Sequence, residues 1–253
     1  MIFKSPGQEQ IPLLRCLWKQ AFGDTEEYLD AFFGTAFLPE RSLCAFDGEV
    51  LTGMLFWFDV SCEERKMAYL YAVATAPEYR GRGVCRQLMT RTQELLRAQG
   101  YAGAMLVPVT DALRQMYASF GYSDCTGISE TFCAAGTVPA PLHRIDTAEY
   151  ARLRRQLLPA GGVVQEKENL ALLETQVKFY RGADFLLAAR HMEEGALFGT
   201  ELLGNAAAAP GILLALGCPR GTFRTPGNKI PYAMFLPLEE GAQAPRYFGF
   251  SFD

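Results

Sequence analysis

Three arginines and two glycines lie close together in the stretch Arg80-Gly-Arg-Gly-Val-Cys-Arg86. An apolar strand is expected before this turn and an amphipathic helix after it, so several backbone N–H groups converge at the start of the helix. Glycine lets an anion approach the main chain closely, and guanidinium groups add to the positive end of the helix dipole. The spacing therefore predicts an anion-binding turn whose ligand carries phosphates.

A tyrosine forms the second candidate for chemistry. Tyr117 lies in Leu113-Arg-Gln-Met-Tyr-Ala-Ser-Phe-Gly-Tyr122, where a helix is expected to end at Gly121. A phenol has a pKa of about 10, so it is protonated at neutral pH and can donate a proton to a thiolate. The alternative is that Tyr117 only packs its helix against a sheet.

The elements that must position these residues are predicted from hydrophobic spacing and turn signals. A strand, two helices, a three-strand meander, a helix, a strand, a helix and two strands are expected in that order. Asp111 is expected to cap the helix that carries Tyr117. The predicted ranges are 2–4, 12–37 for the two helices, 42–47, 50–60, 67–75, 83–99, 104–109, 112–120, 122–125 and 128–133.

With these motifs and this order, the chain resembles the GNAT superfamily of acyl-CoA N-acyltransferases. The family signature is a strand followed by Gln/Arg-x-x-Gly-x-Gly/Ala at the start of a long helix, and Arg80-x-x-Gly83-x-Cys85 matches it. Cys85 departs from the Gly or Ala that is usual at the last position. The block 113–122 matches the second family block, and two blocks at the expected separation are more specific than either alone.

The resemblance implies that acetyl-CoA is the acyl donor. The pyrophosphate would then bind at Arg80, Gly81, Arg82, Gly83, Val84, Cys85 and Arg86. Backbone groups of Val73, Ala74 and Thr75 would hold the pantetheine arm and polarise the thioester carbonyl. Tyr117 would act as the general acid toward the leaving thiolate.

No general base is marked by spacing, and Glu78, Asp59, Asp111 and Glu130 remain candidates. The chain also resembles proteins of the enhanced intracellular survival type, in which the terminal carboxylate is thought to act as the base. This resemblance implies the carboxylate of Asp253 for that role.

The expected reaction is therefore N-acetyl transfer from acetyl-CoA to a primary amine, by direct attack through a tetrahedral intermediate. The acceptor is expected to be a small-molecule or peptide amine. An alternative is a catalytically silent CoA-binding sensor or scaffold protein. A peptidyltransferase that uses charged tRNA is disfavoured by the acidity of the chain.

Composition restricts the class further. The chain has 253 residues, about half of them apolar, and a formal net charge of −4, which argues against nucleic-acid and membrane-surface binding. Its seven cysteines are scattered without a Cys-x-x-Cys pair, and its two histidines have no ligand at metal-binding spacing. Reduced thiols, a cytoplasmic location and the absence of a metal site are expected. The oligomeric state is left open, a homo-oligomer included.

The fold class expected is α/β (α+β), with two tandem GNAT-like domains, each a mixed and mostly antiparallel sheet flanked by helices. A linker at 134–141 places the acetyltransferase domain at 1–137 and a second domain at 138–253. No Arg-x-x-Gly-x-Gly follows the strand that ends at Leu203, so the second domain is expected to be degenerate and to wall the acceptor pocket. An unrelated α+β extension is the alternative. The predicted elements are 143–145, 148–158, 167–180, 185–190, 196–203, 205–216, 222–225, 232–236 and 247–252.

Overall fold

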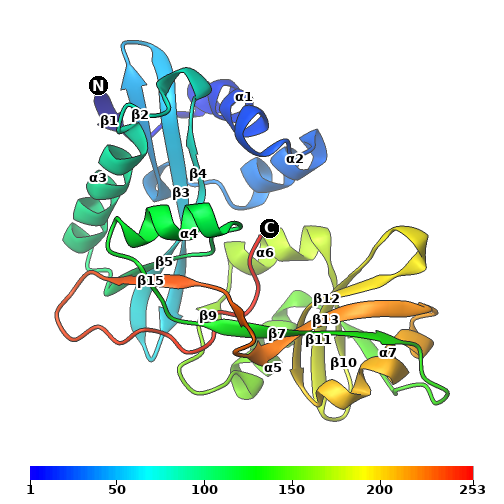
Figure 1. Ribbon diagram of the computed structural model, residues 1–253. Helices are drawn as coiled ribbons and strands as arrows, with labels where there is room; N and C mark the ends of the chain where they lie inside the picture. Colours follow the sequence, from blue (N-terminus) through cyan, green and yellow to red (C-terminus); the bar gives the residue numbers. More distant parts are fainter. Residues whose placement is uncertain (253) are drawn as a thin grey trace. The chain divides into compact units, whose positions relative to one another are not determined.

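The computed structural model describes residues 1–252 and divides into two compact units (Figure 1). Each unit is built from two separate stretches of chain. Unit 1 comprises Met1–Ser123 and Met234–Ala244, and unit 2 comprises Asp124–Ala233 and residues from Pro245 onward. The sequence predicted one boundary after residue 137, whereas the compact units interleave along the chain.

Unit 1 contains a sheet whose strands run in the order β1-β2-β3-β4-β5-β15-β6. Neighbouring strands from β1 to β4 are antiparallel, β4 and β5 are parallel, and β15 is antiparallel to β5. The elements of this unit are β1 (Ile2–Lys4), α1 (Ile11–Phe22), α2 (Glu26–Thr35), β2 (Ser42–Asp47), β3 (Val50–Cys62), β4 (Arg65–Thr75), α3 (Val84–Ala98), β5 (Gly103–Leu106), α4 (Asp111–Ala118), β6 (Ser123–Asp124) and β15 (Met234–Pro237).

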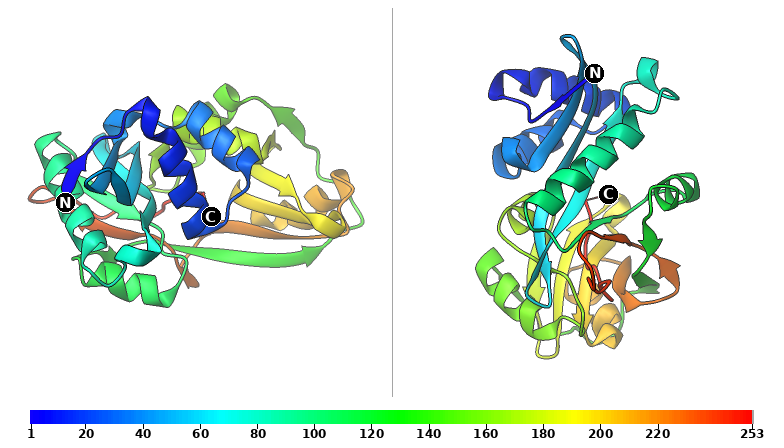
Figure 2. Two further views of the ribbon diagram at one scale, coloured as in Figure 1. Left: turned by 90° about the horizontal axis from the view of Figure 1, so that it is seen from above. Right: turned by 90° about the vertical axis from the view of Figure 1, so that its left-hand side faces the viewer.

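Successive side chains on a strand point to opposite faces of the sheet. Because β3 is apolar at successive positions, both faces of this sheet carry apolar side chains. From β3, Leu55 and Trp57 pack in the same core cluster as Leu88 and Leu96 of α3. Phe56 and Phe58, at the alternate positions of β3, contact Phe32 of α2 with ring centroids 5.1 and 6.4 Å away. The sheet therefore lies between α3 on one face and the α1–α2 pair on the other (Figure 1, Figure 2).

Unit 2 repeats this plan. Its sheet runs in the order β14-β7-β13-β12-β11-β10-β8, antiparallel except for the parallel pair β12–β13, and α7 connects those two strands as α3 connects β4 and β5. The elements are β7 (Gly127–Ala134), β8 (His143–Ile145), α5 (Thr147–Leu157), β9 (Val164–Gln165), α6 (Glu168–Gln176), β10 (Lys178–Arg181), β11 (Phe185–His191), β12 (Leu197–Gly204), α7 (Ala209–Ala215), β13 (Arg220–Gly227) and β14 (Ile230–Pro231).

Several predicted elements are corrected by the structure. The strand expected at 128–133 forms, but it pairs with β13 and β14 of the second sheet, and β15 takes the place beside β5 in the first. The helix expected to run to Tyr180 ends at Gln176, because β10 begins at Lys178. The strand expected at 247–252 is irregular chain. Hydrophobic alternation predicts that a segment is extended and buried, and it does not say which sheet the segment joins.

Three buried tyrosines predict alkaline instability. Burial raises the pKa of Tyr71, Tyr150 and Tyr247 well above the usual value, and the nearby carboxylate of Glu201 adds to the effect at the last two. The folded state thus holds these protons more tightly than the unfolded chain, so the stability they contribute is complete below about pH 10 and is lost above it.

We therefore expect the free energy of unfolding to fall above pH 10 by about 1.4 kcal/mol per pH unit for each such tyrosine. Thermal unfolding followed by circular dichroism, with tyrosinate absorbance recorded in parallel, measures this decline. Ionisation of all the tyrosines in the folded protein before unfolding begins would contradict it.

Candidate active site

Strand β4 loses its second partner halfway along its length. It pairs with β3 from Arg65 to Thr75, whereas its pairing with β5 covers only Met67 to Tyr69. The register with β3 shifts between the Phe56–Tyr71 and Met54–Ala74 pairs, and Ala72 adopts a positive φ of 49°. This bulge precedes Val73, Ala74 and Thr75, whose outer edge is not used by the β4–β5 ladder. An extended polar ligand can pair with that edge.

The turn between β4 and α3 has the backbone that its glycines permit. Gly81 and Gly83 have φ values of +73° and +78°, in the left-handed region that L side chains rarely adopt. A Cβ added at Gly81 would meet nothing within 4 Å, and one at Gly83 would meet only the Gln87 amide at 3.9 Å. The positive φ values, and not close neighbours, therefore explain why both positions are glycine. No other part of the described chain covers the surface of the turn at these two residues.

Gly83 is the N-cap of α3, and no side chain caps the helix. The N–H of Gln87 makes the first helical hydrogen bond, to the carbonyl of Gly83 at 3.0 Å. The N–H groups of Val84, Cys85 and Arg86 precede it in the first turn and have no acceptor within the helix. These donors, at the positive end of a 15-residue helix, form a site for an anion.

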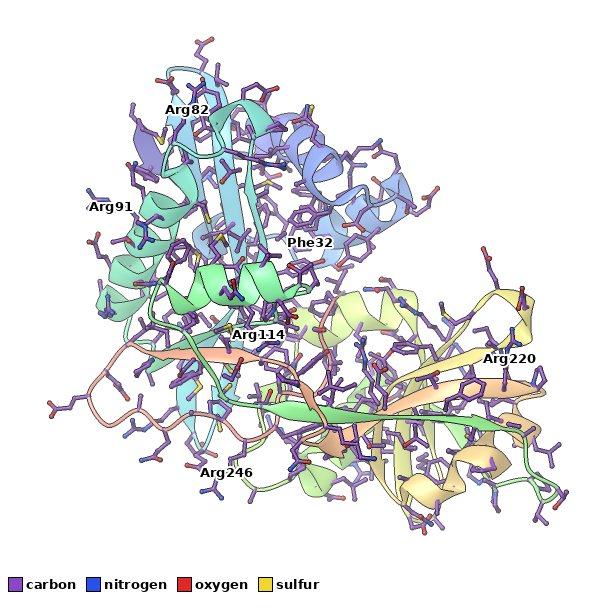
Figure 3. The ribbon with its side chains drawn as sticks, viewed as in Figure 1. Phe32, Arg82, Arg91, Arg114, Arg220 and Arg246 are labelled. Carbon is purple, nitrogen blue, oxygen red and sulfur yellow. The ribbon has the colours of Figure 1, made fainter. Side chains whose placement is uncertain are left out.

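Three guanidinium groups flank this turn, and each also contacts its own surroundings. Arg80 Nε donates to the carbonyl of Thr75 at 3.2 Å, and Arg82 lies 5.3 Å from the ring centre of Tyr79. Arg86 donates to the carbonyl and hydroxyl of Ser119 at 3.4 and 3.3 Å, so it connects α3 to the end of α4. Figure 3 shows Arg82 at the turn, and Arg91 farther along α3.

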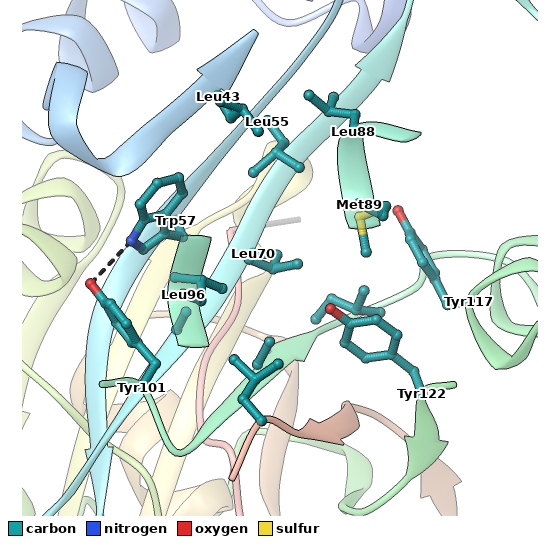
Figure 4. Close-up of a cluster of buried hydrophobic side chains, with 14 of the residues drawn as sticks. Leu43, Leu55, Trp57, Leu70, Leu88, Met89, Leu96, Tyr101, Tyr117 and Tyr122 are labelled. Carbon is teal, nitrogen blue, oxygen red and sulfur yellow. Dashed lines mark hydrogen bonds between the residues drawn. The ribbon is translucent and has the colours of Figure 1, made fainter. Parts of the chain in front are cut away.

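Tyr117 lies on α4, which Thr110 caps by accepting from the N–H of Leu113 at 3.2 Å; the predicted cap, Asp111, is the first helical residue. The Tyr117 ring is 7% exposed and packs in the core cluster with Met89 of α3 (Figure 4). Burial raises the pKa of its phenol, and the nearby Cys85 thiol contributes. Tyr117 is therefore a protonated group that lies close to the first turn of α3.

Packing in the core cluster is the role that the sequence left as the alternative for Tyr117, and the place of its phenol near Cys85 is compatible with the role of a general acid. The role of Tyr117 as the acid therefore stays a prediction.

Cys85 is less reactive than its place at a helix start suggests. Burial raises the pKa of its thiol, and the opposing effect of Arg86 is smaller, so this thiol ionises less readily than thiols at helix N-termini usually do. We expect iodoacetamide at pH 7 to label exposed Cys16 much faster than half-buried Cys85. Peptide mapping by mass spectrometry measures both rates, and equal labelling of the two thiols would contradict the prediction.

The candidate bases differ in their surroundings. Asp59 accepts from the Tyr101 hydroxyl at 2.5 Å and lies 3.7 Å from Arg41, and Glu130 pairs with Arg224 at 2.9 Å. Glu78 and Asp111 are exposed. Asp253 lies outside the described residues. The base therefore stays a prediction, and within residues 1–252 no group of three His, Cys, Asp or Glu side chains could hold a metal ion.

Two features of the site were missed at the sequence level. The bulge at Ala72 has no signal, since alanine rarely adopts a positive φ. The bond from Arg86 to Ser119 joins residues 33 apart, and only tertiary packing brings them together. No helix in the described part of the chain is long and apolar enough to cross a lipid bilayer.

Comparison with known proteins agrees with this geometry. Residues 3–125 match the protein-family model described as "Acetyltransferase (GNAT) domain". The GCN5-related N-acetyltransferase from Kribbella flavida superposes with a TM-score of 0.75 at 18% identity, covering 95% of this chain and 72% of the other. Eis1 from Mycobacterium abscessus gives 0.69 at 13% identity, covering 94% and 74%. No curated protein sequence matches the chain at a significant level.

The fold and the site thus define a protein with a GNAT acetyltransferase domain in its first half. Residues 3–125 form a GNAT acetyltransferase domain, as the sequence motifs predicted, and this domain makes the protein an acyltransferase by class. The superpositions extend over nearly the whole chain, so the fold of unit 2 is shared with these structures as well. The predicted α/β class with two mostly antiparallel sheets is confirmed.

Proposed function

We propose that this protein transfers an acetyl group from acetyl-CoA to a primary amine by direct attack through a tetrahedral intermediate. The observation that carries the proposal is the open glycine turn at the start of α3, with the buried phenol of Tyr117 close to the first turn of that helix. Acyl transfer from a phosphate-bearing thioester needs a site that binds the phosphates and a group that donates a proton to the leaving thiolate. The turn meets the first requirement, and the phenol meets the second.

The residues of the turn fit the donor. Its pyrophosphate would accept hydrogen bonds from the first-turn N–H groups of α3, with Arg80, Arg82 and Arg86 adding positive charge. The edge of β4 at Val73, Ala74 and Thr75, which lies beyond the pairing with β5, would hold the pantetheine arm and polarise the thioester carbonyl. Cys85 stands where the family signature usually has Gly or Ala. Its side chain is short enough for the helix to lie near the pyrophosphate.

Tyr117 would give its proton to the departing thiolate. Burial makes the phenol a weaker acid, but the same burial destabilises a thiolate formed beside it, so the two pKa values rise together. The difference between the two pKa values, which sets the free-energy change of the proton transfer, therefore stays close to its value in water, where the thiol has a pKa of about 8.5 and the phenol one of about 10.

A carboxylate of Asp253 is the base in this proposal, on family resemblance, and it would take a proton from the attacking amine. The acceptor class proposed is a small-molecule or peptide amine. The cysteines of residues 1–252 are all free thiols, which supports a reducing, cytoplasmic location. Appending three residues after Asp253 tests the base, because unchanged turnover in that variant would contradict it.

Acetyl transfer is tested with acetyl-CoA and three amines of different class: tyramine, spermidine and a peptide with a free N-terminus. Release of the CoA thiol and the mass of each product are measured. An acetylated product with any of the three supports the proposal. CoA binding without any acetylated amine would favour a silent sensor or scaffold instead.

A further inference from the structure

Arg86 joins two helices of unit 1 that carry different parts of the proposed site. It lies in the first turn of α3, and its Nη1 and Nη2 donate to the carbonyl oxygen and the hydroxyl of Ser119 at 3.4 and 3.3 Å. Its guanidinium also lies 4.6 Å from the ring centre of Phe120. These two residues directly follow α4, the helix that carries Tyr117. The proposed phosphate turn is thus connected to the helix of the proposed acid.

The hydrogen bonds at the end of α4 show what this contact supplies. The last four carbonyl groups of a helix need partners from outside its regular part, and here the N–H groups of residues 119–121 and the Ser119 hydroxyl provide them. The acceptors are the carbonyl oxygens of Gln115, Met116, Tyr117 and Ala118. The next carbonyl along the chain, that of Ser119, accepts from Arg86. Arg86 therefore extends the cap of α4 by one residue, and it does so from a second helix.

The charge of Arg86 favours the same contact. A helix carries partial positive charge at its N-terminal end and partial negative charge at its C-terminal end. Arg86 lies at the unfavourable end of its own helix, whose first turn contains no acidic side chain, and it donates to the favourable end of α4. The interaction with α4 therefore offsets the unfavourable position in α3, and a bound phosphate would offset it further.

The ring of Tyr117 depends on the same two helices for its place. It lies in the core cluster with Met89 of α3, and it makes an edge contact with Phe120 at 6.2 Å. Phe120 is the ring beside the Arg86 guanidinium. A displacement of this end of α4 would move the phenol with it. A misplacement of about 1 Å in a catalytic group can lower the rate about 100-fold.

We propose that Arg86 is a positioning residue for acyl transfer: its guanidinium fixes the end of α4 against α3 and thereby places the Tyr117 hydroxyl. The inference rests on the proposed function, in which Tyr117 gives its proton to the leaving thiolate. The charge of Arg86 and the shape of its side chain then have separate tasks. The charge adds to the phosphate site, whereas the planar group with its paired donors holds α4, and a lysine could perform only the first task.

The test compares Arg86→Lys, which keeps the charge but loses the planar group, with Arg86→Met, which loses both. Arg91→Lys is the matched control, because Arg91 is an exposed arginine on the same helix and pairs with Glu94 of that helix at 3.0 Å (Figure 3). Each variant is made in the parent and in Tyr117→Phe. The measurements are kcat with tyramine, spermidine and the peptide, the affinity for CoA, and amide hydrogen exchange of residues 111–118.

We expect Arg86→Lys to lower kcat at least about fivefold while CoA affinity stays within about twofold of the parent, and Arg86→Met to lower both quantities. The amides of α4 should exchange faster in both variants. In the Tyr117→Phe background, Arg86→Lys should change kcat by less than about twofold, because the hydroxyl that Arg86 places is already absent. A general loss of stability would instead lower kcat by the same factor in both backgrounds. Arg91→Lys should match the parent throughout.

Equal losses of kcat from Arg86→Lys in the two backgrounds would overturn the positioning role. A parental kcat in Arg86→Lys would overturn it as well, since charge alone would then account for Arg86. Unchanged exchange of residues 111–118 in both variants would contradict the claim that Arg86 holds α4. A parent protein that acetylates none of the three amines would contradict the proposed function, and the exchange data would still decide whether Arg86 holds α4.

Discussion

Tyr117→Phe is expected to lower kcat by about 100-fold or more, while the affinity for CoA stays within about twofold of the parent value. The substitution removes only the hydroxyl, and the ring keeps its packing against α3 and its edge contacts with Phe120 and Tyr122, both at 6.2 Å. Without the phenol, the thiolate must leave unprotonated or take its proton from water. Steady-state release of CoA thiol, with CoA binding measured by calorimetry, separates the two effects.

Tyr122→Phe is the matched control. Tyr122 is 2% exposed, lies beside Tyr117, and its hydroxyl has no hydrogen bond of normal geometry within the described chain. Removing it should leave kcat unchanged and the free energy of unfolding equal or slightly higher, since an unsatisfied buried group is lost. Equal kcat losses in the two variants would show that the ring pair matters only for packing.

Gly83→Val is expected to weaken CoA binding at least about 100-fold and to leave the fold intact. Valine is strongly disfavoured at the φ of +78° that Gly83 adopts, and its side chain would project from the N-cap of α3 into the proposed pyrophosphate site. The loss of several charge-assisted hydrogen bonds accounts for the size of the effect. Calorimetric titration with CoA measures it.

Gly100→Val tests whether backbone strain alone explains that loss. Gly100 follows the other end of α3, has a φ of +74°, and has nothing within 4 Å of an added Cβ. Both substitutions strain the backbone to a similar degree, so both should lower the melting temperature. Only Gly83→Val should affect CoA binding, and normal CoA affinity in that variant would refute the assignment of the turn.

The local part of the site is predictable because neighbouring residues determine it. Gly81 and Gly83 signal a turn with positive φ, the periodic apolar residues from Val84 to Leu96 signal a helix that follows it, and the structure confirms both. The three-strand meander forms as expected, and its first two strands, β2 and β3, are joined by a hairpin turn at Gly48 and Glu49. Each of these signals acts within a few residues.

The long-range part is not predictable in the same way. β15 pairs with β5 although more than 120 residues separate them, and no local pattern distinguishes it from a strand of unit 2. Likewise, Arg154 and Glu201 are charged residues 47 apart, which composition alone would place at the surface. Sheet membership and burial depend on which strand edges are still free when the chain packs.

The sequence by itself determined the turn at 80–86, the helix after it, the tyrosine at 117 and the GNAT domain at residues 3–125, because each depends on residues close together in the chain. Only the tertiary structure decided that the two units interleave, that β4 parts from β5 beyond Tyr69, and that the irregular stretch 247–252 is buried. These features arise from contacts between distant segments, whose free energy is realised only when the whole chain is folded.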